Sequence, residues 1–279
     1  MSSRRPMQRT RSRGNISQEI KVTLKNSINT IQEANHVKMM MYGRTGAGTT
    51  FGALDILKDK NLTGDVIYLN TDLAQNLKDN VLLLPENLQS RLIVPRDENG
   101  EYMIIDSEEK MRAVKSALEA EYGDFSSCAG IVFDYANRFY DALIEKYDPT
   151  IPIKYRKPNE VFRELCWDFV MGANTNSIII SKEKEIYQED MDNPSIQTGS
   201  GEYESMFRGS KADWLTDCNL IIYRETRFRD DRMTRKFVSI FEKHKLGMTA
   251  FEYDDPNGNM WTNIMEFYAK KQKEIREQN

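Results

Sequence analysis

The sequence predicts a three-layer α/β domain with a mostly parallel central sheet. Short apolar runs typical of buried strands alternate with segments whose apolar residues recur at helical spacing. In addition, residues 37–70 read as strand, glycine-rich loop, helix and strand, which is a βαβ unit with parallel strands and a right-handed crossover. At 279 residues, the chain is long enough to bury a full core in one domain.

Apolar runs predict the strands, and helical periodicity predicts the helices between them. The expected strands are VKMMMY (37–42), VIYLN (66–70), AGIVFDY (129–135), SIIIS (177–181), CNLIIYR (218–224) and KFVSIFEKHK (236–245). The expected helices lie at about 16–34, 49–60, 136–146, 159–171 and 261–279, and a further helix follows Asp106 with an apolar stripe of Met111, Val114 and Leu118. The last three strands lie close together, as expected of a C-terminal extension of the sheet.

Two connections carry local signals. Residues 92–106 (LIVPRDENGEYMIID) predict two extended runs around a turn, as in a hairpin. Asp106 and Glu109 resemble a capping box for the helix that follows. The segment between SIIIS and CNLIIYR is long for a connection without structure, and such loops are usually functional or disordered. We therefore expect a mobile loop at about 184–210.

Composition indicates a soluble globular protein, with 39% hydrophobic and 29% charged residues. No apolar run approaches the roughly 18 residues that span a membrane. The arginine-rich start lacks the apolar segment of a secretory signal. The three cysteines have neither disulfide nor metal-ligand spacing, which indicates a reducing compartment and no structural metal. We expect a cytoplasmic protein.

Charge and composition suggest how the chain is organised. The first 14 residues carry five arginines and no acid, although the whole chain has a net charge of −4. We expect residues 1–14 to be disordered, either as a solvated tail or as a contact for nucleic acid or an acidic partner. The nucleotide-binding domain is expected to span residues 15–250, followed by a C-terminal helical extension over 251–279.

GRTGAGTT (43–50), between the first strand and its helix, nearly matches the phosphate-binding loop G-x-x-x-x-G-K-[ST]. Such a loop gathers backbone N–H groups around a phosphate at a helix N-terminus. The expected nucleotide-binding residues are Gly43, Arg44, Thr45, Gly46, Ala47, Gly48, Thr49 and Thr50. The Thr50 hydroxyl is also a candidate ligand for Mg²⁺. The alternative is a glycine turn that only joins strand to helix.

Thr49 stands where the motif has its lysine. A charged hydrogen bond contributes about 1.5–3 kcal/mol, so nucleotide binding is expected to weaken on the order of 10- to 150-fold. Hydrolysis is expected to suffer more, because negative charge develops on the transferring phosphoryl group. Arg44 is the nearest cation in the sequence, but its early place in the loop does not aim it at the same oxygens.

Two acids complete a candidate nucleotide site. Asp134 ends the apolar run IVFD, where a strand-end carboxylate would position Mg²⁺ or its water. Asp72 follows the strand VIYLN and is the candidate group for polarising an attacking water. As an alternative, Asp72 caps a helix or a turn.

The ordered set of these motifs resembles the RecA family of ATPases over roughly residues 36–247. YLNTDLA resembles the RecA-family segment with a catalytic acid, here Asp72, and FEKHKLG resembles the segment with two basic residues, here Lys243 and Lys245. Ser181 and Lys182 fall where relatives carry a polar sensor. The resemblance is closest to the small RecA-like ATPases that phages encode beside recombination and annealing proteins.

This resemblance implies a RecA-like P-loop fold that binds ATP with Mg²⁺ in the host cytoplasm. It implies that Lys243 and Lys245 reach the γ-phosphate of a neighbouring subunit in a homo-oligomer; otherwise they are ordinary surface lysines. It also implies that the loop at about 184–210 contacts DNA, with single-stranded DNA or a recombination protein as partner. Because Thr49 and Asp72 both depart from the family pattern, two functions stay open: a weak ATPase in phage-type recombination or replication, and a pseudo-ATPase that serves as a structural or protein-interaction module.

Overall fold

The computed structural model describes residues 36–44, 46–72, 74–147, 155–189, 197–207, 218–229, 232–244, 251–254 and 259–278. Apart from His36, they belong to one compact unit that spans Val37–Asn279. The expected basic tail (1–14) and the expected helix at 16–34 lie outside the described residues, as do Thr45 and Lys245.

The described strands form one sheet in the order β3-β2-β4-β5-β1-β7-β8-β9, with β6 paired to β5. Their bounds are β1 (Lys38–Gly43), β2 (Val66–Asn70), β3 (Leu92–Ile93), β4 (Gly130–Asp134), β5 (Asn176–Glu189), β6 (Gln197–Ser205), β7 (Cys218–Arg229), β8 (Arg232–His244) and β9 (Phe251–Asp254). Pairing is parallel from β3 to β7, whereas β8, β9 and β6 pair antiparallel with their neighbours.

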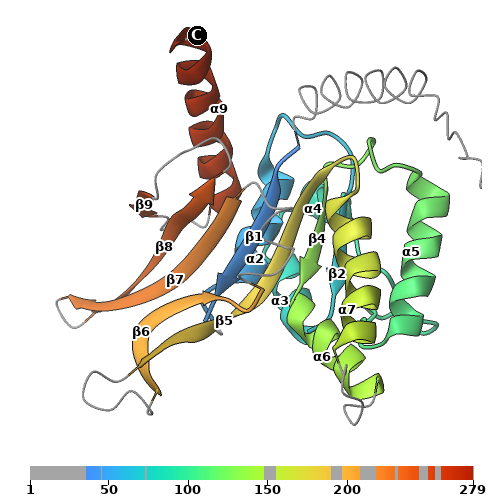
Figure 1. The fold of residues 1–279 in the computed structure, drawn as a ribbon. Coiled ribbons are helices and arrows are strands. Elements are labelled where there is room, and N and C mark those ends of the chain that lie inside the picture. Colours follow the sequence, from blue (N-terminus) through green and yellow to red (C-terminus); the bar gives the residue numbers. More distant parts are fainter. Residues whose placement is uncertain are drawn as a thin grey trace, which may run out of the picture. The chain divides into compact units, whose positions relative to one another are not determined.

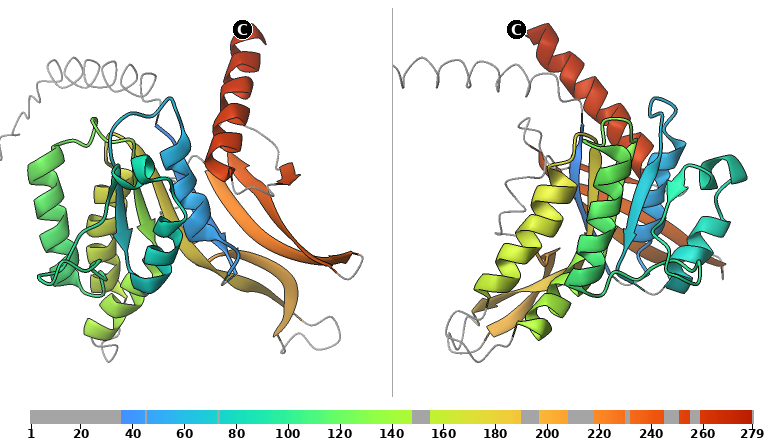
Figure 2. Two further views of the ribbon diagram at one scale, coloured as in Figure 1. Left: turned by 180° about the vertical axis from the view of Figure 1, so that it is seen from behind. Right: turned by 90° about the vertical axis from the view of Figure 1, so that its right-hand side faces the viewer.

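Helices cover both faces of this sheet (Figures 1 and 2). Their bounds are α2 (Thr49–Leu54), the 3-10 turn η1 (Asp55–Lys58), α3 (Ala74–Leu82), α4 (Glu86–Gln89), α5 (Glu108–Tyr122), α6 (Ala136–Lys146), α7 (Arg156–Phe162), the π-helix η2 (Arg163–Met171) and α9 (Met260–Gln278). Within the described part of the chain, no helix has the length and apolar character to cross a membrane.

The core has two layers because alternate residues of a strand point to opposite faces of the sheet. Along β1, Met40 and Tyr42 pack in the cluster formed with α5, α6, α7 and η2. Met39 and Met41 pack in the other cluster, with α2, η1, α3 and α9. This is the three-layer α/β fold, with a mostly parallel sheet and a C-terminal strand extension, that the sequence predicts.

The C-terminal segment differs from the expected helical extension. Residues 251–254 form strand β9 at the sheet edge, paired with β8. Helix α9 begins in the core: Met260 and Trp261 are almost fully buried. The indole nitrogen of Trp261 donates to Asp59 at 3.0 Å. The first turns of α9 are therefore an integral part of the domain, because they complete the layer formed by α2, η1 and α3.

The expected mobile loop at about 184–210 is largely a β-hairpin over its described residues. Strand β5 continues well past the predicted end at Ser181, and β6 pairs back along it from Gln197 to Ser205. The strand prediction stopped early because SKEKEIYQE is strongly charged and has no apolar face. This segment is a strand because its backbone pairs with β6, although its side chains do not indicate a strand.

Two smaller expectations are also corrected. The cap of α5 is Ser107 instead of Asp106, since the Ser107 hydroxyl accepts a hydrogen bond from the Lys110 backbone N–H at 3.3 Å. The expected hairpin at 92–106 is reduced to the two-residue strand β3 and an isolated bridge between Arg96 and Tyr102. By contrast, β2 and α6 have the predicted bounds.

Candidate functional site

The glycine loop leaves β1 and enters α2 with two glycines in the left-handed region. Gly46 has φ 82° and Gly48, the N-cap of α2, has φ 97°. Residues with a Cβ rarely adopt this conformation, so the glycines are needed for the turn. The Ala47 backbone N–H donates to the Arg44 carbonyl at 2.9 Å, which closes the loop. The loop therefore has a defined form over its described residues.

Thr50 and Asp134 meet at the end of the parallel strands. The Thr50 hydroxyl donates to Asp134 Oδ2 at 3.1 Å. Tyr68, fully buried on the neighbouring strand β2, donates its phenol to the same oxygen. The other oxygen, Asp134 Oδ1, is buried without a hydrogen-bond partner among the described residues. A buried carboxylate oxygen without a donor is costly, so it indicates a missing partner.

Burial raises the pKa of Asp134 to about 6, against hydrogen bonds from Tyr68 and Thr50 that oppose the rise. The pKa of Tyr68 lies well above its usual value, first because it is buried and second because Asp134 is negative. The phenol therefore stays protonated as a donor. Burial disfavours the ionised form of this carboxyl group, and a cation bound beside it would stabilise that form.

The donor set fits Mg²⁺ in part. A hydroxyl and a carboxylate supply the hard oxygen atoms that Mg²⁺ prefers, and the unpartnered Asp134 Oδ1 leaves a coordinating atom available. The described residues contain no cluster of three or more His, Cys, Asp or Glu side chains that could hold a metal ion alone. Mg²⁺ commonly completes its shell with water and substrate phosphates, so Thr50 and Asp134 would suffice as protein ligands.

Asp72 lies at the same edge of the sheet, held by two neighbours. Its Oδ1 forms an ion pair with Arg138 Nη1 at 2.7 Å, and its Oδ2 accepts from Asn76 Nδ2 at 2.9 Å. The adjacent Thr71 hydroxyl lies 2.7 Å from the carbonyls of both Asp134 and Tyr135. These bonds tie the ends of β2 and β4 together and place Asp72 beside Asp134.

Thr49 is buried, with 5% of its surface exposed. It lies beside Tyr135, whose pKa is raised first by burial and next by the negative charges of Asp134 and Asp72. Tyr135 has φ 52°, a left-handed conformation that is unusual for a residue with a side chain. The position of the missing lysine is thus enclosed by protein.

Arg44 is directed to β5. Its Nε forms an ion pair with Glu183 Oε1 at 2.9 Å. Glu183 Oε2 is buried without a hydrogen-bond partner among the described residues, so the pair stabilises a buried carboxylate. Arg44 is thereby committed to Glu183 and is poorly suited to replace the lysine.

Of the remaining predicted residues, Ser181 and Lys182 lie beside the strand that leads into the glycine loop, whereas Lys243 belongs to a strand of the C-terminal extension. Ser181 and Lys182 pair in register with Tyr42 and Gly43 of β1, and the Ser181 hydroxyl lies 2.9 Å from that of Ser205. Lys243 is in β8, paired with Asn219 of β7.

Sequence reasoning missed three site residues: Tyr68, Tyr135 and Arg138. Tyr68 lies within an apolar strand and reads as core. Tyr135 and Arg138 follow Asp134 with the spacing of an ordinary helix start. The one available signal was the position of Tyr68 two residues before the end of its strand, because residues near the ends of neighbouring parallel strands meet at one edge.

No protein family model matches the chain, and no curated protein matches it. Among solved structures, the chain is similar to the RadB recombinase, with 16% identity and a TM-score of 0.45. The alignment covers 80% of this chain and 89% of the recombinase. A likeness this remote says nothing about activity. The fold is assigned from the strand order and the two core layers.

Proposed function

We propose that the protein is a RecA-like ATP-binding protein of phage-type DNA recombination or replication, which binds ATP with Mg²⁺ weakly and hydrolyses it slowly. The observation that carries this proposal is the contact of Thr50 with Asp134, 3.1 Å apart, beside an unpartnered carboxylate oxygen. A glycine turn that merely joins a strand to a helix has no need of a buried aspartate against Thr50.

The phosphates of ATP would lie against the backbone N–H groups of the loop from Gly43 to Thr50. Mg²⁺, when bound between Thr50 and Asp134, supplies positive charge that neutralises the phosphates. Tyr68 holds Asp134 in orientation, because its phenol donates to Oδ2 and leaves Oδ1 for the ion.

Asp72 is proposed to polarise the attacking water. Arg138 and Asn76 fix its carboxylate at the sheet edge that also carries Asp134. Arg138 is also a cation at the site, at a position that the sequence motifs do not include.

Positive charge on the γ-phosphate is proposed to come from a second copy of the chain. Thr49 carries no charge, and Arg44 is paired with Glu183. Lys243 and Lys245, if presented across an interface, would supply the missing charge, so that hydrolysis depends on assembly into a homo-oligomer. Single-stranded DNA and a recombination protein are the proposed partners of this assembly.

The burial of Thr49 favours a second function. Because Thr49 lies within the protein beside Tyr135, a phosphate can be excluded from the place where the motif puts its lysine. The alternative is therefore a pseudo-ATPase, a fold retained as a structural or protein-interaction module.

Titration calorimetry with ATP and Mg²⁺ separates the two functions. Wild-type protein, Thr49→Lys and Asp134→Ala are compared with and without EDTA. We expect measurable binding by the wild type that requires Mg²⁺, a gain on the order of 10- to 150-fold in Thr49→Lys, and loss of binding in Asp134→Ala. Lys157→Gln, at an exposed position on α7 away from the loop, is a control for general loss of positive charge.

Absence of binding by the wild type, with binding gained in Thr49→Lys, would favour the pseudo-ATPase. Binding that is unchanged in Asp134→Ala would place the nucleotide elsewhere and contradict both roles of this site.

A further inference from the structure

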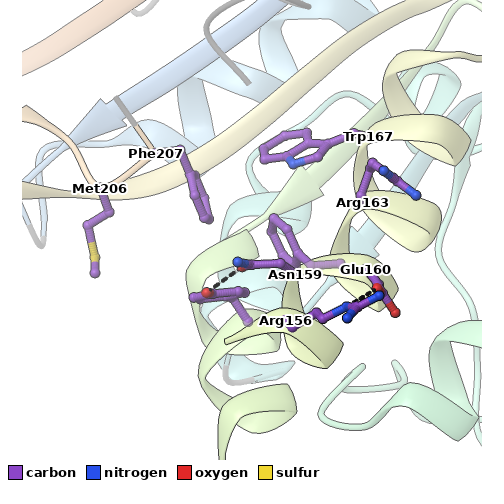
Figure 3. A pocket seen from close by; sticks show the side chains of 9 residues that line it. Arg156, Asn159, Glu160, Arg163, Trp167, Met206 and Phe207 are labelled. Carbon is purple, nitrogen blue, oxygen red and sulfur yellow. Dashed lines mark hydrogen bonds and ion pairs between the residues drawn. The ribbon is translucent and has the colours of Figure 1, made fainter. Parts of the chain in front are cut away.

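A cavity of about 520 Å³ opens beside the π-helix η2 (Figure 3). It is lined by side chains of α6, α7 and η2 and by Met206 and Phe207, which follow β6. None of its lining residues belongs to the glycine loop or contacts Asp134. A cavity of this size can take a large side chain or a small ligand, and π-helices are frequent at functional sites.

Trp167 lines the cavity with its indole ring. The residue is 5% exposed, and its ring packs edge to face against Phe162 and Phe207. In Figure 3 the indole nitrogen lies on the edge of the ring that faces Asn159. An indole N–H is a hydrogen-bond donor, so a ligand with an acceptor could pair with it in this cavity.

The aromatic walls present edges to a ligand, because their faces already pack on each other. Phe162 and Phe207 are stacked at 5.3 Å between ring centroids. Trp167 meets both of them edge to face, at 5.1 and 5.5 Å. Single-stranded nucleic acid binds by stacking its bases on free aromatic faces. An inserted aromatic side chain, in contrast, packs well against ring edges.

The rim of the cavity is basic. Arg156 pairs with Glu160 at 3.1 Å and Arg163 with Asp168 at 3.9 Å, and all four side chains are at least 45% exposed. Exposed pairs of this kind contribute little to stability, so both guanidinium groups can turn to an anion on a ligand. Met206, 40% exposed at the rim, adds a flexible apolar side chain of the kind used at adaptable binding surfaces.

We propose that this cavity binds a peptide of a partner protein through one aromatic side chain flanked by acidic residues. The aromatic ring fills the space bounded by Phe162, Trp167 and Phe207. A backbone carbonyl of the peptide accepts from the Trp167 indole N–H, and the flanking carboxylates pair with Arg156 and Arg163. The site is independent of nucleotide binding.

The indole N–H of Trp167 gives a direct readout by NMR of the ¹⁵N-labelled full chain, because Trp167→Phe identifies its signal by removing it. The probe is a capped peptide with phenylalanine between aspartates. We expect the Trp167 signal to move saturably with a Kd of about 1 mM or tighter. Trp167→Phe keeps a ring but loses the donor, and affinity, followed on other signals, should fall about 2- to 10-fold.

Matched variants and probes test each element of the recognition. Arg156→Gln with Arg163→Gln should abolish the shift, whereas Lys157→Gln, exposed on the same helix but outside the cavity, should leave it unchanged. Peptides with alanine in place of phenylalanine, or with lysines in place of the aspartates, should not bind. An unmoved Trp167 signal, an equal response to the alanine peptide, or a response to oligo-thymidylate in place of the peptide would each overturn the proposal.

Discussion

At the scale of single residues, the site depends on how Asp134 is satisfied. Its Oδ2 accepts from Tyr68 and Thr50, while Oδ1 is buried without a partner among the described residues. The protein keeps this costly group although a neutral side chain of the same shape would be easier to bury. Such a cost is typical of functional residues, where stability is given up for activity.

Asp134→Asn should raise the free energy of unfolding of the nucleotide-free protein by about 1 kcal/mol, because a neutral amide is cheaper to bury than a carboxylate. The same variant should lose Mg²⁺-dependent ATP binding. Urea unfolding and calorimetry measure the two effects. Asp79→Asn, the same change at an exposed site on α3, should alter neither. A less stable Asp134→Asn that still binds would contradict the proposed role.

Motifs and strand ends in the sequence led to the candidate residues Thr50, Asp134 and Asp72, but no pattern in the sequence pointed to the residues that contact them. Thr50, Asp134 and Asp72 were predicted because each follows a strand or a glycine loop. Tyr68 and Arg138 were missed, because a tyrosine in an apolar strand and an arginine in a helix have no distinguishing pattern. Their roles depend on which strands are neighbours, and only the sheet order supplies this information.

At the scale of elements, α5 and α6 are joined through one carboxylate. Glu108, in the first turn of α5, accepts from Lys146 at 2.7 Å and from Arg112 at 2.8 Å, and also from the phenol of Tyr147. Burial would raise the pKa of Glu108, but hydrogen bonds from Lys146, Tyr147 and Arg112 outweigh it and lower the pKa to about 2. The negative charge of Glu108 also interacts favourably with the helix dipole, because it lies at the N-terminus of α5.

This lowered pKa predicts a dependence of stability on pH. Because the folded protein holds Glu108 ionised more firmly than the unfolded chain does, its contribution is complete above about pH 4.5 and is lost as the pH falls toward about 2. The free energy of unfolding of Glu108→Gln should therefore fall less steeply over this window than that of the wild type. Glu121→Gln, at an exposed position of α5, is the control. Parallel curves for wild type and Glu108→Gln would refute the assignment.

The burial of Trp261 in helix α9 leads to a second prediction at the scale of elements. Trp261 is 1% exposed and donates to Asp59. Trp261→Ala should lower the free energy of unfolding by about 3–5 kcal/mol through the cavity it leaves. Trp261→Phe keeps most of the volume and should cost clearly less. If Trp261→Ala unfolds at the same denaturant concentration as the wild type, α9 is an appendage, as the sequence had suggested.

Elements were predictable where hydrophobic periodicity decides them, as for β2 and α6. The sequence failed where backbone pairing decides them. The outer half of β5 is charged along its length, yet it is a strand because β6 bonds to it. Likewise, the sequence predicts α9 only as a C-terminal helical extension. Its first turns are buried because they pack on α2 and η1, which are distant in sequence.

At the scale of the whole molecule, the described residues bring the glycine loop, Asp134 and Asp72 to one edge of a mostly parallel sheet. They leave Lys243 on the antiparallel extension, in β8. The proposed function requires the two regions of different copies to meet. Hydrolysis should therefore rise faster than in proportion to protein concentration, and Lys243→Ala should remove that excess while leaving ATP binding by the isolated chain intact.

The most direct measurement is Mg²⁺-dependent ATP hydrolysis by the wild type and by Asp134→Ala, each with and without single-stranded DNA. We expect slow hydrolysis that DNA accelerates and that Asp134→Ala abolishes. Equal rates for the two proteins, or no turnover by the wild type under any condition, would contradict the proposal that Thr50 and Asp134 form a working ATP site.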